Sequence, residues 1–173
     1  MKFDRPNQDE YAPFYETYVS RVPEGDVVAL LADQVRQTEA LLTGLSEKQA
    51  LHRYGEGKWS VKEVVGHMAD TERVMSYRAL CISRGEQAGL PAFDEDAYVA
   101  AAGFDRRPLE DLVYDFLAVR QATLRLLSGM DEEATRRMGI ASNKPISVRA
   151  LAYIIAGHEL HHRHILAERY GLS

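Results

Sequence analysis

Cysteine is almost absent from this chain of 173 residues, since Cys81 is the only one. A single cysteine excludes an intrachain disulfide and any zinc site built from several thiolates. Long apolar runs are missing too: no stretch approaches membrane-spanning length, and the first residues lack the apolar core of a signal peptide. We therefore expect a soluble, cytoplasmic protein with no membrane partner.

An excess of basic residues is also lacking. The formal net charge is −5 at pH 7, and the short pairs Arg106–Arg107 and Arg136–Arg137 stand beside acidic residues. Nucleic-acid binding needs a clustered basic face, so we expect no nucleic-acid partner. With 46% hydrophobic and 27% charged residues, the composition is that of a globular protein, and the length suits one domain over residues 1–173.

Hydrophobic periodicity predicts an all-α protein with four long helices and no convincing strand. Asp26 and Ser60 are typical N-caps, and Pro108 suits the first turn of a helix. The long helices are expected over Asp26–Leu42, Ser60–Ser83, Pro108–Gly129 and Ser147–Tyr170. Shorter helical segments are expected over Ala12–Val19, Asp94–Ala101 and Asp131–Arg137. With its long crossover between the second and third helices, this pattern describes a four-helix bundle.

Two histidines of the last helix, His158 and His162, are the strongest functional signal. They lie four residues apart, so they stack on successive turns and can share one metal ion. At about 100° per residue, both fall near the middle of the helix's apolar stripe, which faces the interior. Buried imidazoles need partners, and a transition metal suits two of them on one turn. The alternative is a pair of core histidines with ordinary hydrogen-bond partners.

Two further histidines flank this pair. His164 points well away from the apolar stripe, so we expect it in solvent or at an interface. His161 lies on the shoulder of the stripe, and its role stays open.

A catalytic zinc-type site usually has a third protein ligand. The segment from His158 to His162 also satisfies H-E-x-x-H, the zinc-protease signature, in which Glu159 is the general base. That interpretation fails because Glu168, the only downstream carboxylate side chain, sits roughly 120° round the helix from His162. A di-iron bundle also fails, because we find no second Glu-x-x-His motif beside Glu159 and His162.

The upstream candidates for a third ligand are His52 and His67. His52 lies in a polar stretch and is expected in an exposed loop. His67 lies at the edge of the apolar stripe of its helix, where it can reach a neighbouring helix or stand half exposed at the rim. Glu63 and Asp70, one turn either side, can orient its ring or remain surface carboxylates.

Two segments together resemble a known family. Residues 58–73 read KWSVKEVVGHMADTER, and residues 157–162 read GHELHH. They resemble the DinB/YfiT-like superfamily, in which W-S-x-x-E-x-x-x-H-x-x-D precedes a C-terminal H-x-x-x-H pair. The resemblance covers nearly the whole chain, from Tyr11 to Tyr170.

This resemblance implies an up-down-down-up four-helix bundle that is often a homodimer. It implies a divalent metal ion held by three histidines, which correspond to His67, His158 and His162. Activities in the superfamily include thiol transfer with low-molecular-weight thiols such as bacillithiol, mycothiol-dependent isomerisation and metal-dependent hydrolysis. The resemblance therefore implies a small-molecule substrate, with a low-molecular-weight thiol as one candidate. Glu159 is not a ligand in this pattern and stays a candidate catalytic base.

A metal held by three neutral imidazoles keeps its charge and an open face, so it can activate bound water or a bound thiol. Activation of water makes a hydrolase, and activation of a thiol makes a transferase. The analogy with the family favours the transferase. The alternative from another class is a non-catalytic metal-binding stress or interaction protein. An open pocket beside the metal indicates an enzyme, whereas a fourth protein ligand indicates a structural site. Zinc, nickel and iron all suit imidazole ligands.

Five other residues carry weaker signals. Arg78 can meet an anionic substrate or pair with a carboxylate at the surface. Arg120 interrupts the apolar stripe of the third helix, so it either pairs with an inward carboxylate or reaches out to solvent. We expect Cys81 to be a small buried hydrophobe. Ala156 and Leu160 point outward in the predicted helix and can join a dimer contact.

Overall fold

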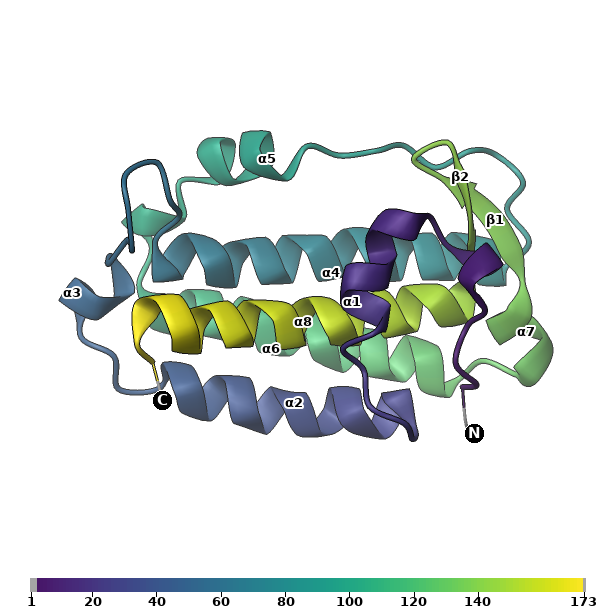
Figure 1. The fold of residues 1–173 in the computed structure, drawn as a ribbon, viewed down its shortest axis with the longest axis horizontal. Helices are drawn as coiled ribbons and strands as arrows, with labels where there is room; N and C mark the ends of the chain where they lie inside the picture. Colours follow the sequence, from purple (N-terminus) through teal and green to yellow (C-terminus); the bar gives the residue numbers. More distant parts are fainter. Residues whose placement is uncertain (1–2, 173) are drawn as a thin grey trace.

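The structure of this protein, a computed structural model, describes residues 3–172. Four long helices form a bundle (Figure 1): α2 (Val27–Leu42), α4 (Val61–Ser83), α6 (Leu109–Ser128) and α8 (Val148–Tyr170). Helices α4 and α6 run in one direction and α2 and α8 in the other, which confirms the predicted up-down-down-up bundle. Among the described residues, no helix combines the length and apolarity that crossing a membrane requires.

The helices begin where the capping residues predict. The Asp26 carboxylate accepts hydrogen bonds from the first turn of α2. Ser60 and Glu63 form a reciprocal capping box at the start of α4. Ser147 caps α8, which ends at Gly171 in the left-handed conformation, with φ of 68°.

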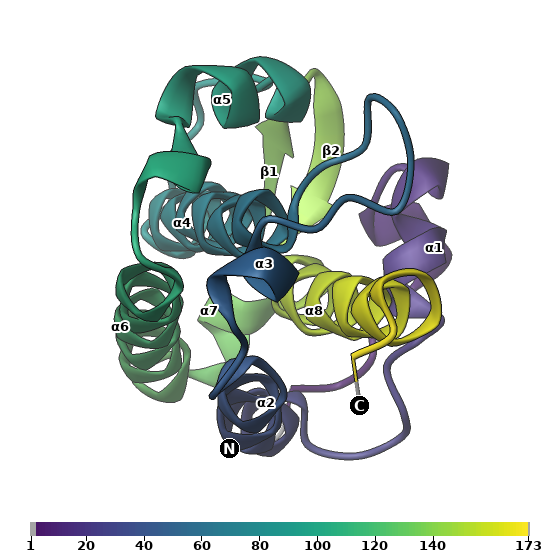
Figure 2. The same cartoon turned by 90° about the vertical axis from the view of Figure 1, so that its left-hand side faces the viewer.

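Short elements fill the connections. They are α1 (Glu16–Val19), α3 (Glu47–Ala50), α5 (Glu95–Ala102), α7 (Glu132–Arg136) and the 3₁₀ turns Gln8–Glu10, Pro13–Tyr15 and Phe104–Arg106. Figure 2 shows α1 on the outer side of α8, and α5 on the side of α4 away from the bundle. The crossover between α4 and α6 runs back along the length of α4 through α5 (Figure 1).

The prediction of no strand is wrong over residues 138–147. Strands β1 (Met138–Ala141) and β2 (Lys144–Ser147) form an antiparallel hairpin. Its two turn residues, Ser142 and Asn143, have φ of 52° and 59°, as a type I′ hairpin turn requires. Strands of four residues are too short for an alternating pattern to be recognised. The crossover pairs with this hairpin, because the Leu90 N–H donates to the Ile140 carbonyl.

A buried polar layer separates two apolar clusters in the bundle. One cluster contains Leu31, Met75, Leu127 and Leu151, and the other contains Leu42, Val64, Phe116 and Leu166. Each long helix contributes buried polar side chains between its two apolar parts. They are Gln34 and Thr38 from α2, His67, Thr71 and Glu72 from α4, Arg120 and Thr123 from α6, and His158, Glu159 and His162 from α8.

Helix α8 is buried around its whole circumference over residues 150–159. Ala156 is fully buried, so the prediction that it points outward is wrong. The physical reason is that α1 covers the face that a bundle of four helices alone would expose. Leu160 is half-buried. The homodimer stays a prediction.

Candidate metal centre

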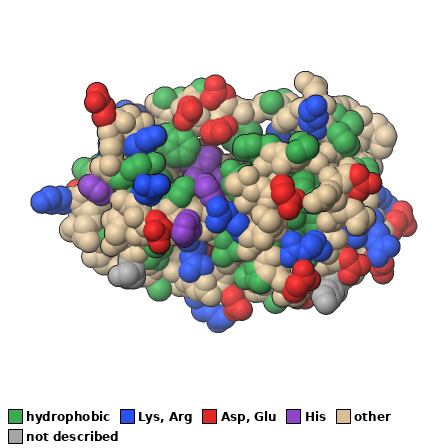
Figure 3. All heavy atoms as spheres, in the orientation of Figure 1, with side chains coloured by type: hydrophobic (Ala, Val, Ile, Leu, Met, Phe, Trp, Pro, Cys, Tyr) green, Lys and Arg blue, Asp and Glu red, His purple; other side chains and the backbone are tan. Residues whose placement is uncertain are grey.

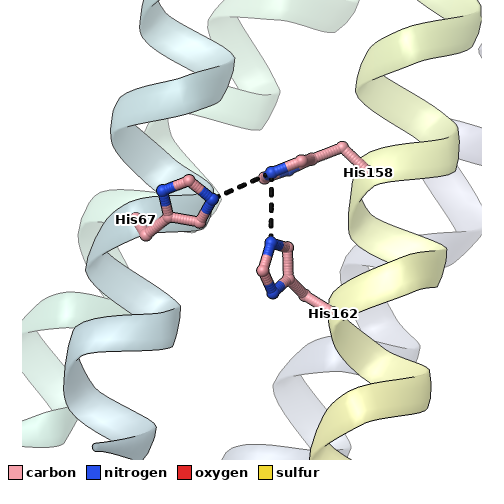
Figure 4. Close-up of side chains that lie close together, drawn as sticks. All are labelled: His67, His158 and His162. Atoms are coloured by element: carbon pink, nitrogen blue, oxygen red, sulfur yellow. Dashed lines mark hydrogen bonds between the residues drawn. The ribbon is translucent and has the colours of Figure 1, made fainter. Parts of the chain in front are cut away.

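Three histidines from two helices meet inside the bundle (Figure 4). His67 projects from α4, and His158 and His162 project toward it from successive turns of α8. The Nε2 atom of His158 lies 3.0 Å from Nε2 of His67 and 3.1 Å from Nε2 of His162. All three side chains are buried. Within residues 3–172, they form a cluster whose ligand atoms all lie within 4.8 Å of one another.

Protons alone do not satisfy these three nitrogens. A neutral imidazole nitrogen carries either a hydrogen or a lone pair, so Nε2 of His158 can complement only one of its two neighbours at a time. A cation at the centre accepts all three lone pairs at once. Metal–nitrogen bonds of about 2.0–2.1 Å place neighbouring nitrogens roughly 3 Å apart, which matches the spacing here. The donor set therefore fits a divalent transition-metal ion.

Burial keeps the three imidazoles neutral. It lowers the pKa of His67 to about 4, with a further contribution from the charge of His161. Burial also lowers the pKa of His158 and His162 well below the ordinary value, and the neighbouring histidines add to this effect. At neutral pH all three rings are therefore in the form that binds a metal.

The residues expected to orient His67 do not contact it. Glu63 belongs to the cap of α4, and the Asp70 carboxylate accepts a hydrogen bond from Arg73 at 2.9 Å. The polar side chain next to the other ring nitrogen of His67 is Thr71, whose Oγ1 lies 3.5 Å from Nδ1. Thr71 follows His67 by four residues on α4, so this helical spacing is the signal in the sequence that identifies it as a neighbour of the ring.

Glu159 lies in the buried polar layer and not in the pocket beside the histidines. Its carboxylate accepts a hydrogen bond from Thr38 and forms an ion pair with Arg120 at 2.7 Å. Burial raises the pKa of this carboxyl group, although Arg120 and Thr38 oppose the shift. This position argues against the predicted role of Glu159 as a general base.

Arg120 pairs with inward carboxylates, one of the two alternatives drawn from the sequence. Its guanidinium donates to both Glu72 oxygens at 2.8 and 2.7 Å and to the Leu31 carbonyl at 3.0 Å. Burial lowers the pKa of Arg120, but Glu72 and Glu159 more than compensate, so its pKa is raised and the charge is permanent. Through Glu159, the neighbour of His158, the network links α8 to α6 and α4 beside the histidines.

A pocket of about 210 Å³ opens beside the three histidines. In Figure 3 histidine side chains are visible near the middle of this face, where the surface is hollowed. The Trp59 ring lies 4.6 Å from the His67 ring, and the Tyr18 ring lies 5.3 Å from the His158 ring. Other aromatic lining residues are Phe14, Tyr15 and Phe93. These walls could not be predicted from the sequence, because they come from separate segments: the 3₁₀ turn Pro13–Tyr15, α1, the residues just before α4 and the crossover.

The other candidate residues lie outside the cluster of three histidines. His161 is half-buried and lines the pocket without joining the three converging nitrogens. His52 and His164 are exposed, as predicted. Cys81 is only half-buried and packs at the margin of the core. Arg78 is buried and lines the pocket, so the alternative of a surface arginine is wrong.

A larger groove of about 640 Å³ lies between the end of α2 and the start of α6. Its walls contain no histidine or cysteine, and its acidic residues are Glu39, Glu47 and Glu110. The chemistry of the donor groups therefore points to the smaller pocket.

Comparison with known proteins gives the family. Residues 30–166 match the sequence model of the DinB superfamily, and the chain belongs to this superfamily. A protein of Oceanobacillus iheyensis named "putative metal-dependent hydrolase" is 24% identical over 150 residues, which cover 82% of this chain and 86% of that protein.

Two solved structures share the fold. YfiT from Bacillus subtilis, described as a probable metal-dependent hydrolase with an unusual four-helix bundle topology, matches with a TM-score of 0.72 and 16% identity over 98% of this chain and 95% of its own. A mycothiol-dependent maleylpyruvate isomerase matches with a TM-score of 0.67 and 10% identity over 84% of this chain and 61% of its own.

Proposed function

We propose that this protein is an enzyme that binds one divalent metal ion through His67, His158 and His162 and acts on a small molecule in the adjoining pocket. The observation that carries the proposal is the open pocket beside three converging imidazoles. Within the described residues, no cysteine or carboxylate completes the cluster as a fourth ligand. A site that is open on one side is typical of catalytic metal centres, whereas structural sites are closed.

The bound ion would supply Lewis acidity, which lowers the pKa of a coordinated thiol or water molecule. The chain's own residues would prepare the site for this chemistry. The three imidazoles are neutral because they are buried, so they leave the ion its full charge. The aromatic side chains Trp59 and Tyr18 limit the access of water to the histidines.

Of the two reactions, we propose thiol transfer to an electrophilic small molecule as the primary one. A thiol bound to a cation needs only to release its proton, whereas hydrolysis also benefits from a general base beside the attacking water. Glu159 is turned into the Arg120 network, and the only carboxylate that lines the pocket, Glu95, is exposed. Names among the relatives support both options, since one is named a putative metal-dependent hydrolase and another a mycothiol-dependent isomerase.

The test is a thiol-transfer assay with the metal-loaded protein, several low-molecular-weight thiols, including bacillithiol and mycothiol, and a chromogenic electrophile. We expect turnover that depends on metal and falls at least about 100-fold in His158→Ala, because a ligand is lost. His164→Ala is the matched control, since this histidine is exposed on the same helix.

Three results would count against thiol transfer. Turnover that persists after chelation excludes the metal from the reaction. Hydrolysis of ester substrates without any thiol transfer favours the hydrolase. No turnover with either panel, despite bound metal, favours the non-catalytic binding protein.

A further inference from the structure

Arg78 of α4 is a buried cation that pairs with no carboxylate among the described residues. Lys62 and Arg120, the other buried cations of the described chain, pair with carboxylates at 2.6 and 2.7 Å. Arg78 is 1% exposed and has no carboxylate within ion-pairing distance among residues 3–172. A buried charge without a partner is costly, so it indicates a ligand that supplies the opposite charge.

Some N–H groups of the Arg78 guanidinium have no hydrogen-bond partner among the described residues. Its Nη2 donates to the Pro91 carbonyl at 2.7 Å and to the Ser142 hydroxyl at 3.0 Å, and Nη1 donates to the Met75 sulfur at 3.6 Å. These bonds use three of the five N–H groups of an arginine, and the sulfur is a weak acceptor. The neutral partners hold the group in place but leave its charge unbalanced.

Arg78 lines the same pocket as the three histidines. His67, Thr71, Met75 and Arg78 follow one face of α4 along the pocket wall. Eleven residues separate His67 from Arg78, which is about 16 Å along a helix. Both side chains lean toward the N-terminus of their helix and arginine is the longer of the two, so the guanidinium lies somewhat closer to the histidines, at on the order of 10 Å.

Between these two ends the walls are largely apolar, apart from Thr71. Met75, Ile154 and Phe93 line the pocket, and the Arg78 guanidinium lies over the Phe93 ring at 5.8 Å. Glu95 is the one carboxylate of the lining, and it is exposed. The positive charges of a bound divalent ion and of Arg78 together would exceed the single negative charge of Glu95. The pocket therefore suits an elongated anion.

We propose that Arg78 is a substrate-binding residue that recognises a carboxylate at the far end of an elongated small molecule with an apolar body. This inference rests on the proposed function, since the reacting group of that molecule would lie at the histidines. It specifies the substrate class: a carboxylate and a reactive centre on the order of 10 Å apart. Arginine suits this task because its charge is permanent and its N–H groups match a carboxylate.

The test uses 4-phenylbutyrate and its uncharged amide, 4-phenylbutyramide, as probes in isothermal titration calorimetry with the full-length protein. We expect the parent to bind the carboxylate at least about tenfold more tightly than the amide, as for a charge-assisted hydrogen bond. In Arg78→Gln the preference should vanish while the affinity for the amide stays within about twofold. Arg78→Lys should restore part of the preference, because it keeps the charge.

Arg73→Gln is the matched control, since Arg73 is a more exposed arginine on the same helix that pairs with Asp70. It should keep the full preference. Retention of the carboxylate preference in Arg78→Gln, or no preference in the parent, would overturn the proposal. Arg78 would then have a structural role only, in joining the crossover to the hairpin through its hydrogen bonds. Circular dichroism shows whether each variant is folded, and the ratio within one variant is independent of its active fraction.

The same titration in metal-free protein separates this inference from the proposed function. We expect the carboxylate preference to survive chelation, because Arg78 does not need the metal to bind an anion. A preference that appears only with metal places the carboxylate on the ion and overturns the role of Arg78. Metal content measured in parallel tests the proposed function by itself, and Arg78→Gln should retain the parent's metal.

Discussion

Arg120 is the residue on which the buried polar layer depends most. It is fully buried and forms ion pairs with carboxylates from two helices, Glu72 on α4 and Glu159 on α8. Its charge therefore links three of the four long helices at the level of the histidines. Nothing in a single sequence identifies the partners, because they lie 48 and 39 residues away along the chain.

Arg120→Met should destabilise the protein by about 3–5 kcal/mol, because it leaves Glu72 and Glu159 buried without a counter-ion. Urea denaturation followed by circular dichroism measures the loss. Arg125→Met, an exposed arginine on the same helix, should change the free energy of unfolding by less than about 0.5 kcal/mol. Equal effects of the two substitutions would show that the network contributes nothing.

Stability of the metal-free protein should fall as the pH drops from about 6.5 to 4. His67 has a pKa of about 4 when folded and 6.5 as its ordinary value, so the unfolded chain binds more protons in this range. The stability that His67 contributes is complete above the unfolded pKa and is lost as the pH falls through the folded one. At pH 4 the loss from His67 amounts to roughly 3 kcal/mol.

Denaturation curves of the parent and His67→Asn at several pH values check this. The free energy of unfolding of the variant should depend less steeply on pH between pH 4 and 6.5 than that of the parent. A dependence as steep as the parent's would mean that His67 is not protonated more readily in the unfolded chain.

At the scale of elements, α1 packs unusually closely on α8. A Cβ atom at Gly157 would lie 2.0 Å from the Tyr18 carbonyl oxygen, so only glycine allows this approach. The contact places Tyr18 beside His158 and thereby forms one wall of the pocket.

Gly157→Ala should therefore displace α1 and destabilise the protein by about 1–3 kcal/mol. Hydrogen exchange should show faster exchange of α1 amides, and denaturation gives the energy. Gly55→Ala is the control, because its new Cβ would meet only the Lys58 side chain at 3.6 Å. Unchanged protection of α1 in Gly157→Ala would contradict the close approach.

Long elements could be predicted from the sequence, and short ones only partly. The four long helices have strong caps and apolar stripes, so their bounds agree with the structure to within one residue. The hairpin was missed because its strands are four residues long. The buried faces of α8 were only partly predictable from the sequence. Its outer face is covered by α1, and this packing is a tertiary contact that helix periodicity does not describe.

The candidate site shows the same limit. The spacing of His158 and His162 places both on one helix face, and His67 was found through the family motif. Tyr18 and the partners of Glu159 belong to the surroundings of the site, which depend on packing between distant segments. Sequence periodicity describes one helix at a time and carries no information about such contacts.

For the whole molecule, the bundle concentrates its buried polar groups in one layer between two apolar clusters. The clusters stabilise the fold, and the layer carries the histidines on one side and the Arg120 network on the other. The central claim is that this arrangement holds one metal ion through three imidazoles.

Elemental analysis of the purified protein, combined with titration of the metal-free form by zinc, nickel and iron(II), tests this claim most directly. The account predicts close to one ion per chain in the parent and a large loss in His67→Ala, His158→Ala and His162→Ala, with His164→Ala unchanged. A parent that binds no ion with any of these metals, or a variant of the three that binds as well as the parent, would contradict it.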